Sequence, residues 1–114
     1  MTTKGIRDSF DLDKTVKKRE FVVEDYLKEK VEQLGGKCYK FVSPGYDGMP
    51  DRLVLYRGAV VFIECKKHGK KPRKLQEVRL REIMDQRVPA YVIDSKEQVD
   101  NLIARLSTCG RIHV

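Results

Sequence analysis

Two carboxylates and one ammonium group stand at positions where they could act together on a phosphate. Asp51, Glu64 and Lys66 lie in or beside short apolar stretches, and Glu64 and Lys66 are separated by a single residue. Side chains at such a spacing on a β-strand point to the same face of the sheet. Charged groups in apolar surroundings are costly unless they pair or bind a ligand. These residue types suit a divalent cation with oxygen ligands and a lysine beside it.

The register of a predicted hairpin decides whether Asp51 and Glu64 meet. If the chain turns symmetrically at Arg57-Gly58, Asp51 lies opposite Glu64 with both side chains on one face. A cation between them would remove their repulsion, and Lys66 could stabilise charge on a phosphate or help to deprotonate water. A three-residue turn with a bulge would shift the register by one residue. Taken singly, the same residues also fit an edge-strand ion pair and a loop cap after Pro50.

Hydrophobic periodicity predicts the elements that must position these residues, in the order α-β-β-β-α-β-α. We expect helices over 15–34 and 73–87, a third helix opening with a capping box from Ser95 to Gln98, and strands over 37–42, 51–56, 60–66 and 90–93. The natural packing is an α/β fold with a mixed β-sheet flanked by helices. Residues 1–14 are expected to form an N-terminal arm, and residues 15–114 a single domain.

Apolar residues at helical spacing predict which helix faces turn inward. On the second helix, Leu75 and Val78, with Glu82 or Ile83, are expected to mark the inner edge. For the first and third helices, the residues expected inside are Val23, Leu27, Val31, Leu34, Val99, Leu102, Ile103 and Leu106.

A basic run follows the third strand and suits a polyanionic partner. The chain carries 24 Lys and Arg against 17 Asp and Glu, a net charge of +7, which favours binding to nucleic acid. A solvated loop is the alternative interpretation of the run. No base-reading helix is evident, so recognition of nucleic-acid shape is expected rather than of sequence. The predicted phosphate-binding residues are Lys67, Lys70, Lys71, Arg73 and Lys74.

Other features narrow the class of protein. Three widely spaced cysteines without a CxxC pair predict neither a zinc site nor a disulfide framework. No apolar run approaches the roughly 20 residues of a membrane span, and no export signal is evident. The sequence lacks a glycine-rich loop of the kind that cradles phosphates, so no nucleotide cofactor is predicted. We therefore expect a cytoplasmic protein without a membrane partner, and we assign neither His68 nor His113 to a metal.

The spacing of Pro50-Asp51 and Glu64-Cys65-Lys66 looks like the PD-(D/E)XK nuclease signature. The surrounding sequence resembles the VRR-NUC domain over roughly residues 21–106, which implies a restriction-endonuclease-like αβββαβ core. The segments that carry the resemblance are Glu24-Asp25-Tyr26-Leu27, Gly35-Gly36, Tyr39-Lys40-Phe41, Ser43-Pro44-Gly45, Gly48-Met49-Pro50-Asp51-Arg52-Leu53-Val54-Leu55, Phe62-Ile63-Glu64-Cys65-Lys66, Gln76 and Tyr91-Val92-Ile93-Asp94-Ser95-Lys96.

The resemblance implies a role for each matching residue. Asp51 and Glu64 would hold Mg²⁺ or Mn²⁺ with the backbone carbonyl of Cys65, and Lys66 would be the catalytic lysine. Glu24 would approach the same centre and orient a water or a second metal; the alternative is a solvated helix carboxylate. Gln76 would contact water or phosphate; the alternative is a surface glutamine.

Two departures from the family pattern limit what is carried over. Cys65 stands where a larger aliphatic residue is usual, and its thiol is expected to be a small core group. Leu80 stands where related nucleases often place a tyrosine, so no tyrosine role is assigned.

The expected activity is hydrolysis of phosphodiester bonds in DNA by a metal-dependent endonuclease. The resemblance implies a homodimer that cleaves branched DNA such as Holliday junctions, as in DNA repair. A short isolated domain of this kind suggests a bacterial or phage source. Alternatives are a non-catalytic nucleic-acid-binding module, a non-specific nuclease or exonuclease, and a flap-directed nuclease of the same fold.

Overall fold

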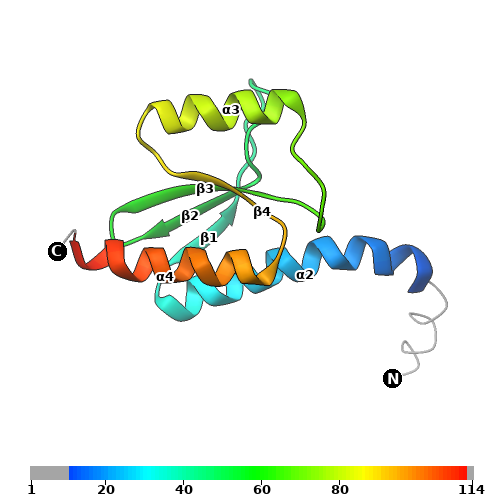
Figure 1. Ribbon diagram of the computed structural model, residues 1–114, viewed down its shortest axis with the longest axis horizontal. Coiled ribbons are helices and arrows are strands. Elements are labelled where there is room, and N and C mark those ends of the chain that lie inside the picture. Colours follow the sequence, from blue (N-terminus) through cyan, green and yellow to red (C-terminus); the bar gives the residue numbers. More distant parts are fainter. Residues whose placement is uncertain (1–10, 113–114) are drawn as a thin grey trace.

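The computed structural model describes residues 11–112 and confirms the predicted order of elements (Figure 1). The elements are α2 (Asp11–Leu34), β1 (Lys37–Lys40), β2 (Arg52–Tyr56), β3 (Ala59–Cys65), α3 (Lys74–Asp85), β4 (Ala90–Ile93) and α4 (Lys96–Ile112).

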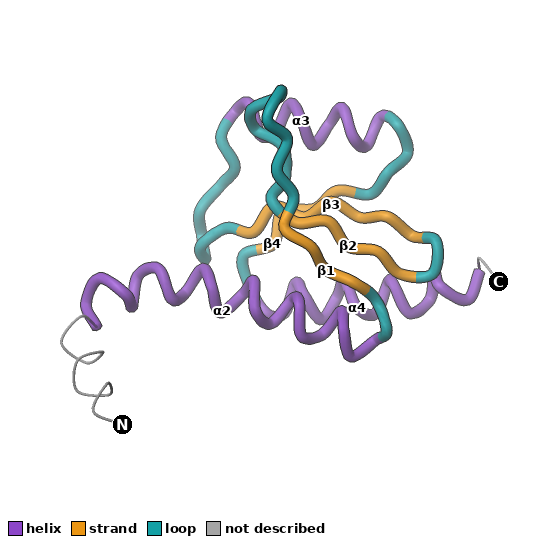
Figure 2. Tube along the Cα trace, turned by 180° about the vertical axis from the view of Figure 1, so that it is seen from behind, coloured by secondary structure: helices purple, strands orange, loops and turns teal. Residues whose placement is uncertain are grey.

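The four strands form one mixed sheet in the order β1-β2-β3-β4, as expected for the α/β fold. The pairs β1–β2 and β2–β3 are antiparallel, whereas β3 and β4 are parallel. Helices α2 and α4 cover one face of the sheet and α3 lies over the other (Figures 1 and 2). The parallel pair follows from the α3 crossover, because a parallel connection needs a helix-length segment.

The hydrophobic core fills the space between the sheet and the α2/α4 layer. Alternate residues of β2 and β3 point into it, including Val54, Val61 and Ile63, and the predicted inward residues of α2 and α4 meet them. Removal of this apolar surface from water is the main stabilising contribution to the fold. The helix residues in this core are Val23, Leu27, Val31, Val99, Leu102 and Leu106, with Leu34 and Ile103 packed against it.

The β2–β3 hairpin turns at two residues, as the symmetric alternative requires. Arg57 and Gly58 both have positive φ, 43° and 86°, the backbone of a type I′ turn whose twist matches the strands. Tyr56 pairs with Ala59, and the register continues without a bulge to Arg52 opposite Ile63. The next pair outward along the ladder is therefore Asp51 and Glu64.

Several boundaries differ from those predicted. Helix α2 begins at Asp11 rather than at residue 15, so residues 11–14 are helical, while residues 1–10 lie outside the described part. Residues 107–112, which the sequence left open, continue α4. Strand β1 ends at Lys40, and only Cys38 on it is buried. One face of β1, which carries Lys37 and Tyr39, is therefore exposed.

The predicted inner edge of the second helix is wrong for Leu75, Val78 and Glu82, whereas Ile83 is half-buried. Leu75 and Val78 are exposed, whereas Gln76 and Leu80 are the buried residues of α3. Hydrophobicity alone cannot find this face, because α3 covers a sheet face that carries charged groups and Gln76 is buried against them. None of the described helices combines the length and the apolar composition that crossing a bilayer requires.

Candidate active site

Asp51 and Glu64 lie on the α3 face of the sheet, at the end where β2 begins and β3 ends. Asp51 immediately precedes β2, and its Oδ1 accepts a hydrogen bond of 3.2 Å from the backbone N–H of Cys65. Burial raises the pKa of Asp51 above its ordinary value. This contact fixes the carboxylate of Asp51 beside the end of β3, so the carboxylates of Asp51 and Glu64 are neighbours.

Glu64 is a buried carboxylate with one satisfied and one unsatisfied oxygen. Burial, followed by the negative charge of Asp51, raises its pKa from 4.5 to about 7. Its Oε2 accepts a hydrogen bond of 3.0 Å from Gln76 Nε2 and lies 3.5 Å from Lys66 Nζ. Its Oε1 is buried without any hydrogen-bond partner. An unpaired buried oxygen of this kind is unusual and calls for a physical explanation.

Gln76 connects the start of α3 to Glu64. Its Oε1 accepts a hydrogen bond of 2.8 Å from the backbone N–H of Arg73, the residue that caps the helix, while its Nε2 donates to Glu64. Because the amide oxygen is held by a backbone donor, the amide nitrogen must face the carboxylate. Of the two interpretations of Gln76, the structure excludes the surface glutamine, since only 7% of the residue is exposed.

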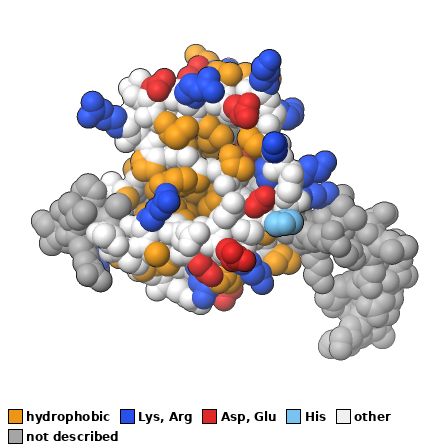
Figure 3. All heavy atoms as spheres, in the orientation of Figure 1, with side chains coloured by type: hydrophobic (Ala, Val, Ile, Leu, Met, Phe, Trp, Pro, Cys, Tyr) orange, Lys and Arg blue, Asp and Glu red, His pale blue; other side chains and the backbone are white. Residues whose placement is uncertain are grey.

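Lys66 begins the basic loop that runs from β3 to α3. Its backbone N–H donates to Ile93 O, and the backbone N–H of Gly69 donates to Asp94 Oδ2 at 3.0 Å, so β4 anchors this loop. The loop leaves the sheet at the end where the carboxylates lie, and Lys and Arg side chains gather on that side of the molecule (Figures 1 and 3). Lys67 is half-buried; the exposed members of the run are Lys70, Lys71, Arg73 and Lys74.

Glu24 pairs with Arg52 instead of pointing into solvent. Its Oε2 accepts hydrogen bonds from Arg52 Nε at 3.1 Å and from an Arg52 terminal nitrogen at 2.9 Å, and both side chains are largely buried. The charge of Glu24 also contributes to the raised pKa of Asp51, although less than burial does. Glu24 is thus near the centre but held by Arg52.

Arg52 is a site residue that the sequence analysis did not single out. It alternates with Val54 and Tyr56 on the core-facing side of β2. An arginine at a core-facing position requires an acidic partner, and this signal could have identified Arg52. Cys65 faces the same core, and burial raises the pKa of its thiol, which matches the expected small core group.

The carboxylate pair is compatible with Mg²⁺ or Mn²⁺. Within residues 11–112, no group of three His, Cys, Asp or Glu side chains gathers in one place. Mg²⁺ is commonly held by one or two carboxylates together with waters. The unpartnered Oε1 of Glu64, beside a second carboxylate, supplies the hard anionic oxygens that such an ion prefers. Asp51 and Glu64 could therefore hold it, and a backbone carbonyl and waters could complete its shell.

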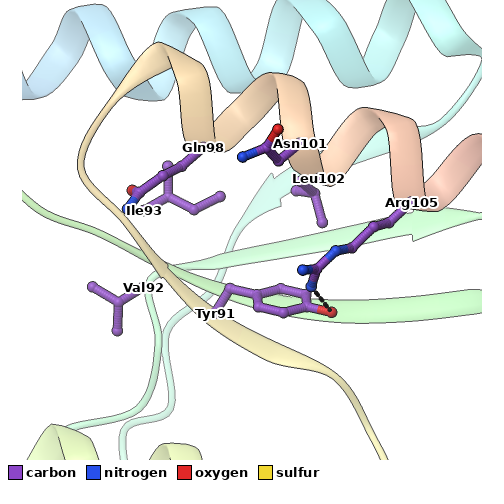
Figure 4. Close-up of a pocket in the computed structure, with 7 residues that line it drawn as sticks. All are labelled: Tyr91, Val92, Ile93, Gln98, Asn101, Leu102 and Arg105. Atoms are coloured by element: carbon purple, nitrogen blue, oxygen red, sulfur yellow. Dashed lines mark hydrogen bonds between the residues drawn. The ribbon is translucent and has the colours of Figure 1, made fainter.

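A separate pocket of about 200 Å³ lies between β4 and α4 (Figure 4). Tyr91 and Arg105 line it, with Arg105 Nη1 donating to the Tyr91 hydroxyl at 3.4 Å. No acidic side chain lines this pocket, so it offers no carboxylate to a cation. Glu64, Lys66 and Gln76 are gathered on the α3 face of the sheet instead.

The fold and this carboxylate–lysine arrangement define a restriction-endonuclease-like α/β protein. A solved structure described as "VRR_NUC domain" matches with a TM-score of 0.70 and 36% sequence identity, covering 75% of this chain and 95% of that chain. The chain therefore belongs to the VRR-NUC domain family. No family model matches the sequence.

A curated relative comes from Acyrthosiphon pisum secondary endosymbiont phage 1 and is named "Putative nuclease p44". It is 51% identical over 59 residues, which are 51% of this chain. The matched stretch spans 63% of the relative's own length.

Proposed function

We propose that this chain is a Mg²⁺- or Mn²⁺-dependent endodeoxyribonuclease that hydrolyses phosphodiester bonds in branched DNA. The observation that carries the proposal is the unpartnered Oε1 of Glu64, buried beside Asp51 and within reach of Lys66. A buried carboxylate with a raised pKa and a specific charged partner is typical of functional sites. Membership of the VRR-NUC family and likeness to a phage protein named as a nuclease support the same activity.

Each residue of the centre has a role in this proposal. Asp51, Glu64 and the Cys65 carbonyl would hold the cation, which would neutralise phosphate charge and lower the pKa of a water. Lys66 would place its ammonium group beside the phosphate and stabilise the charge that develops there. Gln76 would position Glu64, because it donates to Oε2 and leaves Oε1 free. Glu24, fixed by Arg52, would orient a water near Asp51.

The basic loop would hold the DNA backbone next to this centre. Four of its basic residues lie on the segment that joins Lys66 to α3, and the fifth opens that helix: Lys67, Lys70, Lys71 and Arg73, then Lys74. Lysine and arginine contacts with phosphates give affinity that is independent of sequence and falls as salt increases. The anchoring of Gly69 by Asp94 holds the loop close to the end of the sheet.

Branched substrates such as Holliday junctions suit a homodimer in this proposal. Paired cuts on a four-way junction need two centres related by symmetry, which two copies of the chain would supply. The net charge of +7 favours association with the dense phosphates of a junction.

A cleavage assay on linear, flap, circular and four-way junction DNA tests the proposal. Glu64→Ala and Asp51→Ala should each lower Mg²⁺-dependent cleavage on the order of 10³-fold or more, equivalent to about 4 kcal/mol of transition-state stabilisation. Binding to the same DNA should persist. The matched control is Glu97→Ala, an exposed carboxylate in the first turn of α4, which should cleave like the unaltered chain.

The outcomes separate the alternatives. Equal cleavage by Glu64→Ala and the unaltered chain would rule out the proposed centre. Binding without cleavage in any divalent metal would identify a non-catalytic module. Equal rates on all linear and branched substrates would remove the junction preference, and failure to open circular DNA would indicate an exonuclease.

A further inference from the structure

The loop 43–50 between β1 and β2 contacts both the sheet and α3. At its base, Phe41 N–H donates to Asp51 O at 2.8 Å, and the Phe41 ring packs edge-on against Phe62, with ring centroids 5.3 Å apart. Gly48 has φ of +85° and lies so close to α3 that a Cβ there would be 2.9 Å from Leu75 Cγ. A segment with this many fixed contacts can present a side chain in a defined position.

Arg79 of α3 clamps the tip of this loop. Its Nε donates to Asp47 O at 2.9 Å, and its guanidinium carbon lies 5.0 Å from the centroid of the Tyr46 ring. A further bond to Glu82 at 3.0 Å fixes the guanidinium in place. Tyr46 is nevertheless 63% exposed. The ring is thus supported by a cation at 5.0 Å while most of it remains in solvent.

Tyr46 lies in the loop that leads into the proposed centre. The loop leads directly into Asp51, and five fully extended residues span at most about 18 Å. Arg79 lies one helical turn beyond Gln76, which contacts Glu64. The loop 43–50 and the basic loop both rise from the same end of the sheet toward the start of α3 (Figures 1 and 2). DNA held by the basic loop would therefore pass close to Tyr46.

A single exposed tyrosine needs no special explanation. Tyr46, however, is exposed, is held by Arg79 and lies in the loop that leads to Asp51. We propose that Tyr46, supported by Arg79, is a stacking platform for an unpaired nucleobase beside the cleaved phosphate. The inference rests on the proposed nuclease function and narrows its branched substrates to those that present an unpaired nucleotide at the branch. Bases in a continuous duplex are stacked on both sides, whereas an unpaired base can stack on an aromatic ring and gains about 1–3 kcal/mol.

Binding of two matched DNA probes tests the platform. One is a continuous duplex; the other is a flap of the same sequence with a fluorescent purine analogue at the first unpaired position. Affinity is measured in EDTA with the full chain. Tyr46→Ala and Tyr46→Leu should weaken flap binding about tenfold and abolish the change in analogue fluorescence, because stacking contributes about 1–3 kcal/mol per base. Duplex affinity should not change, and Tyr46→Phe should behave like the unaltered chain.

Tyr39→Ala is the matched control. Tyr39 is also an exposed tyrosine, and no cation lies over its ring among the described residues, so its loss should leave flap binding unchanged. Tyr46→Leu retains an apolar side chain, and an unchanged melting temperature shows that it folds.

Distinct outcomes would overturn the stacking proposal and the nuclease proposal. Equal weakening of duplex and flap by Tyr46→Ala, no weakening of either, or loss of flap binding in Tyr46→Phe would each overturn the stacking role. Cleavage is scored separately with Mg²⁺, so a chain that shows the flap preference but never cuts contradicts the nuclease proposal alone.

Discussion

The two faces of the sheet divide stability and chemistry between them. The α2/α4 face buries an apolar cluster in which Leu27, Val31, Val54 and Ile63 are fully inaccessible. The α3 face buries Glu64 and Gln76 instead, and leaves apolar residues of α3 exposed. Glu64 faces one way and its neighbour Cys65 the other. A small sheet can therefore hold charged groups in a fixed geometry on one face because the opposite face supplies the hydrophobic stabilisation.

Leu27→Ala should have the largest effect on stability. Its side chain is fully buried, so we expect a loss of about 2–5 kcal/mol in the free energy of unfolding. Val78→Ala, on the exposed side of α3, should change it by no more than about 0.5 kcal/mol. Urea denaturation of both variants measures the two changes in the free energy of unfolding. Equal losses would show that the exposed side of α3 contributes as much to the core as α2 does.

Glu64→Gln should stabilise the metal-free protein at high pH. The folded-state pKa of Glu64, about 7, is above the unfolded value of 4.5, so the folded state holds the extra proton and stability falls as pH rises between these values. The substitution should therefore add on the order of 1–3 kcal/mol at pH 8 and little at pH 4.

Thermal melting across this pH range measures the effect of Glu64→Gln. Addition of Mg²⁺ at pH 8 should raise the melting temperature of the unaltered chain but not of the variant. A pH-independent difference between the two would mean that the carboxylate of Glu64 does not titrate in this range.

Gln76→Ala should have the smallest of these effects and should act through Glu64. Loss of the amide removes the 3.0 Å bond to Glu64 and the helix-capping bond to Arg73 N–H. We expect about a tenfold loss of cleavage, the lower end for loss of a group that orients a metal ligand. A stability-only role would lower the melting temperature without changing the Mg²⁺ concentration needed for half-maximal rate, whereas a positioning role should raise that concentration.

Much of the fold was predictable because hydrophobic periodicity identifies the buried face of a helix or strand when that face packs only against apolar residues. The stripes on α2 and α4 match the core, and the hairpin register follows from the turn at Arg57-Gly58. The failure occurred at α3, where Leu75 and Val78 were expected inside and Gln76 is buried instead. A hydrophobic pattern cannot predict that a glutamine is buried, because its burial depends on a hydrogen-bond partner from another element.

The candidate site shows the same limit. Spacing and register place Asp51 with Glu64 and Lys66, and the structure brings these residues together. Their metal-binding and catalytic roles remain predictions. The partnership of Glu24 with Arg52 joins residues far apart in the chain, and no local pattern could specify it. The contact of Arg79 with the loop 43–50 likewise depends on how α3 lies over the sheet.

The turn at Arg57-Gly58 has a consequence for how this domain can vary. Every side chain on β2 and β3 owes its face to the two-residue turn, since strand side chains alternate with a period of two. One added or removed residue at the turn would shift the pairing of β2 with β3 by one residue. The side chains of Asp51 and Glu64 would then lie on opposite faces of the sheet. Insertions and deletions in homologues of this domain should therefore be absent from the β2–β3 turn. They should occur in loops that do not determine the register of paired strands.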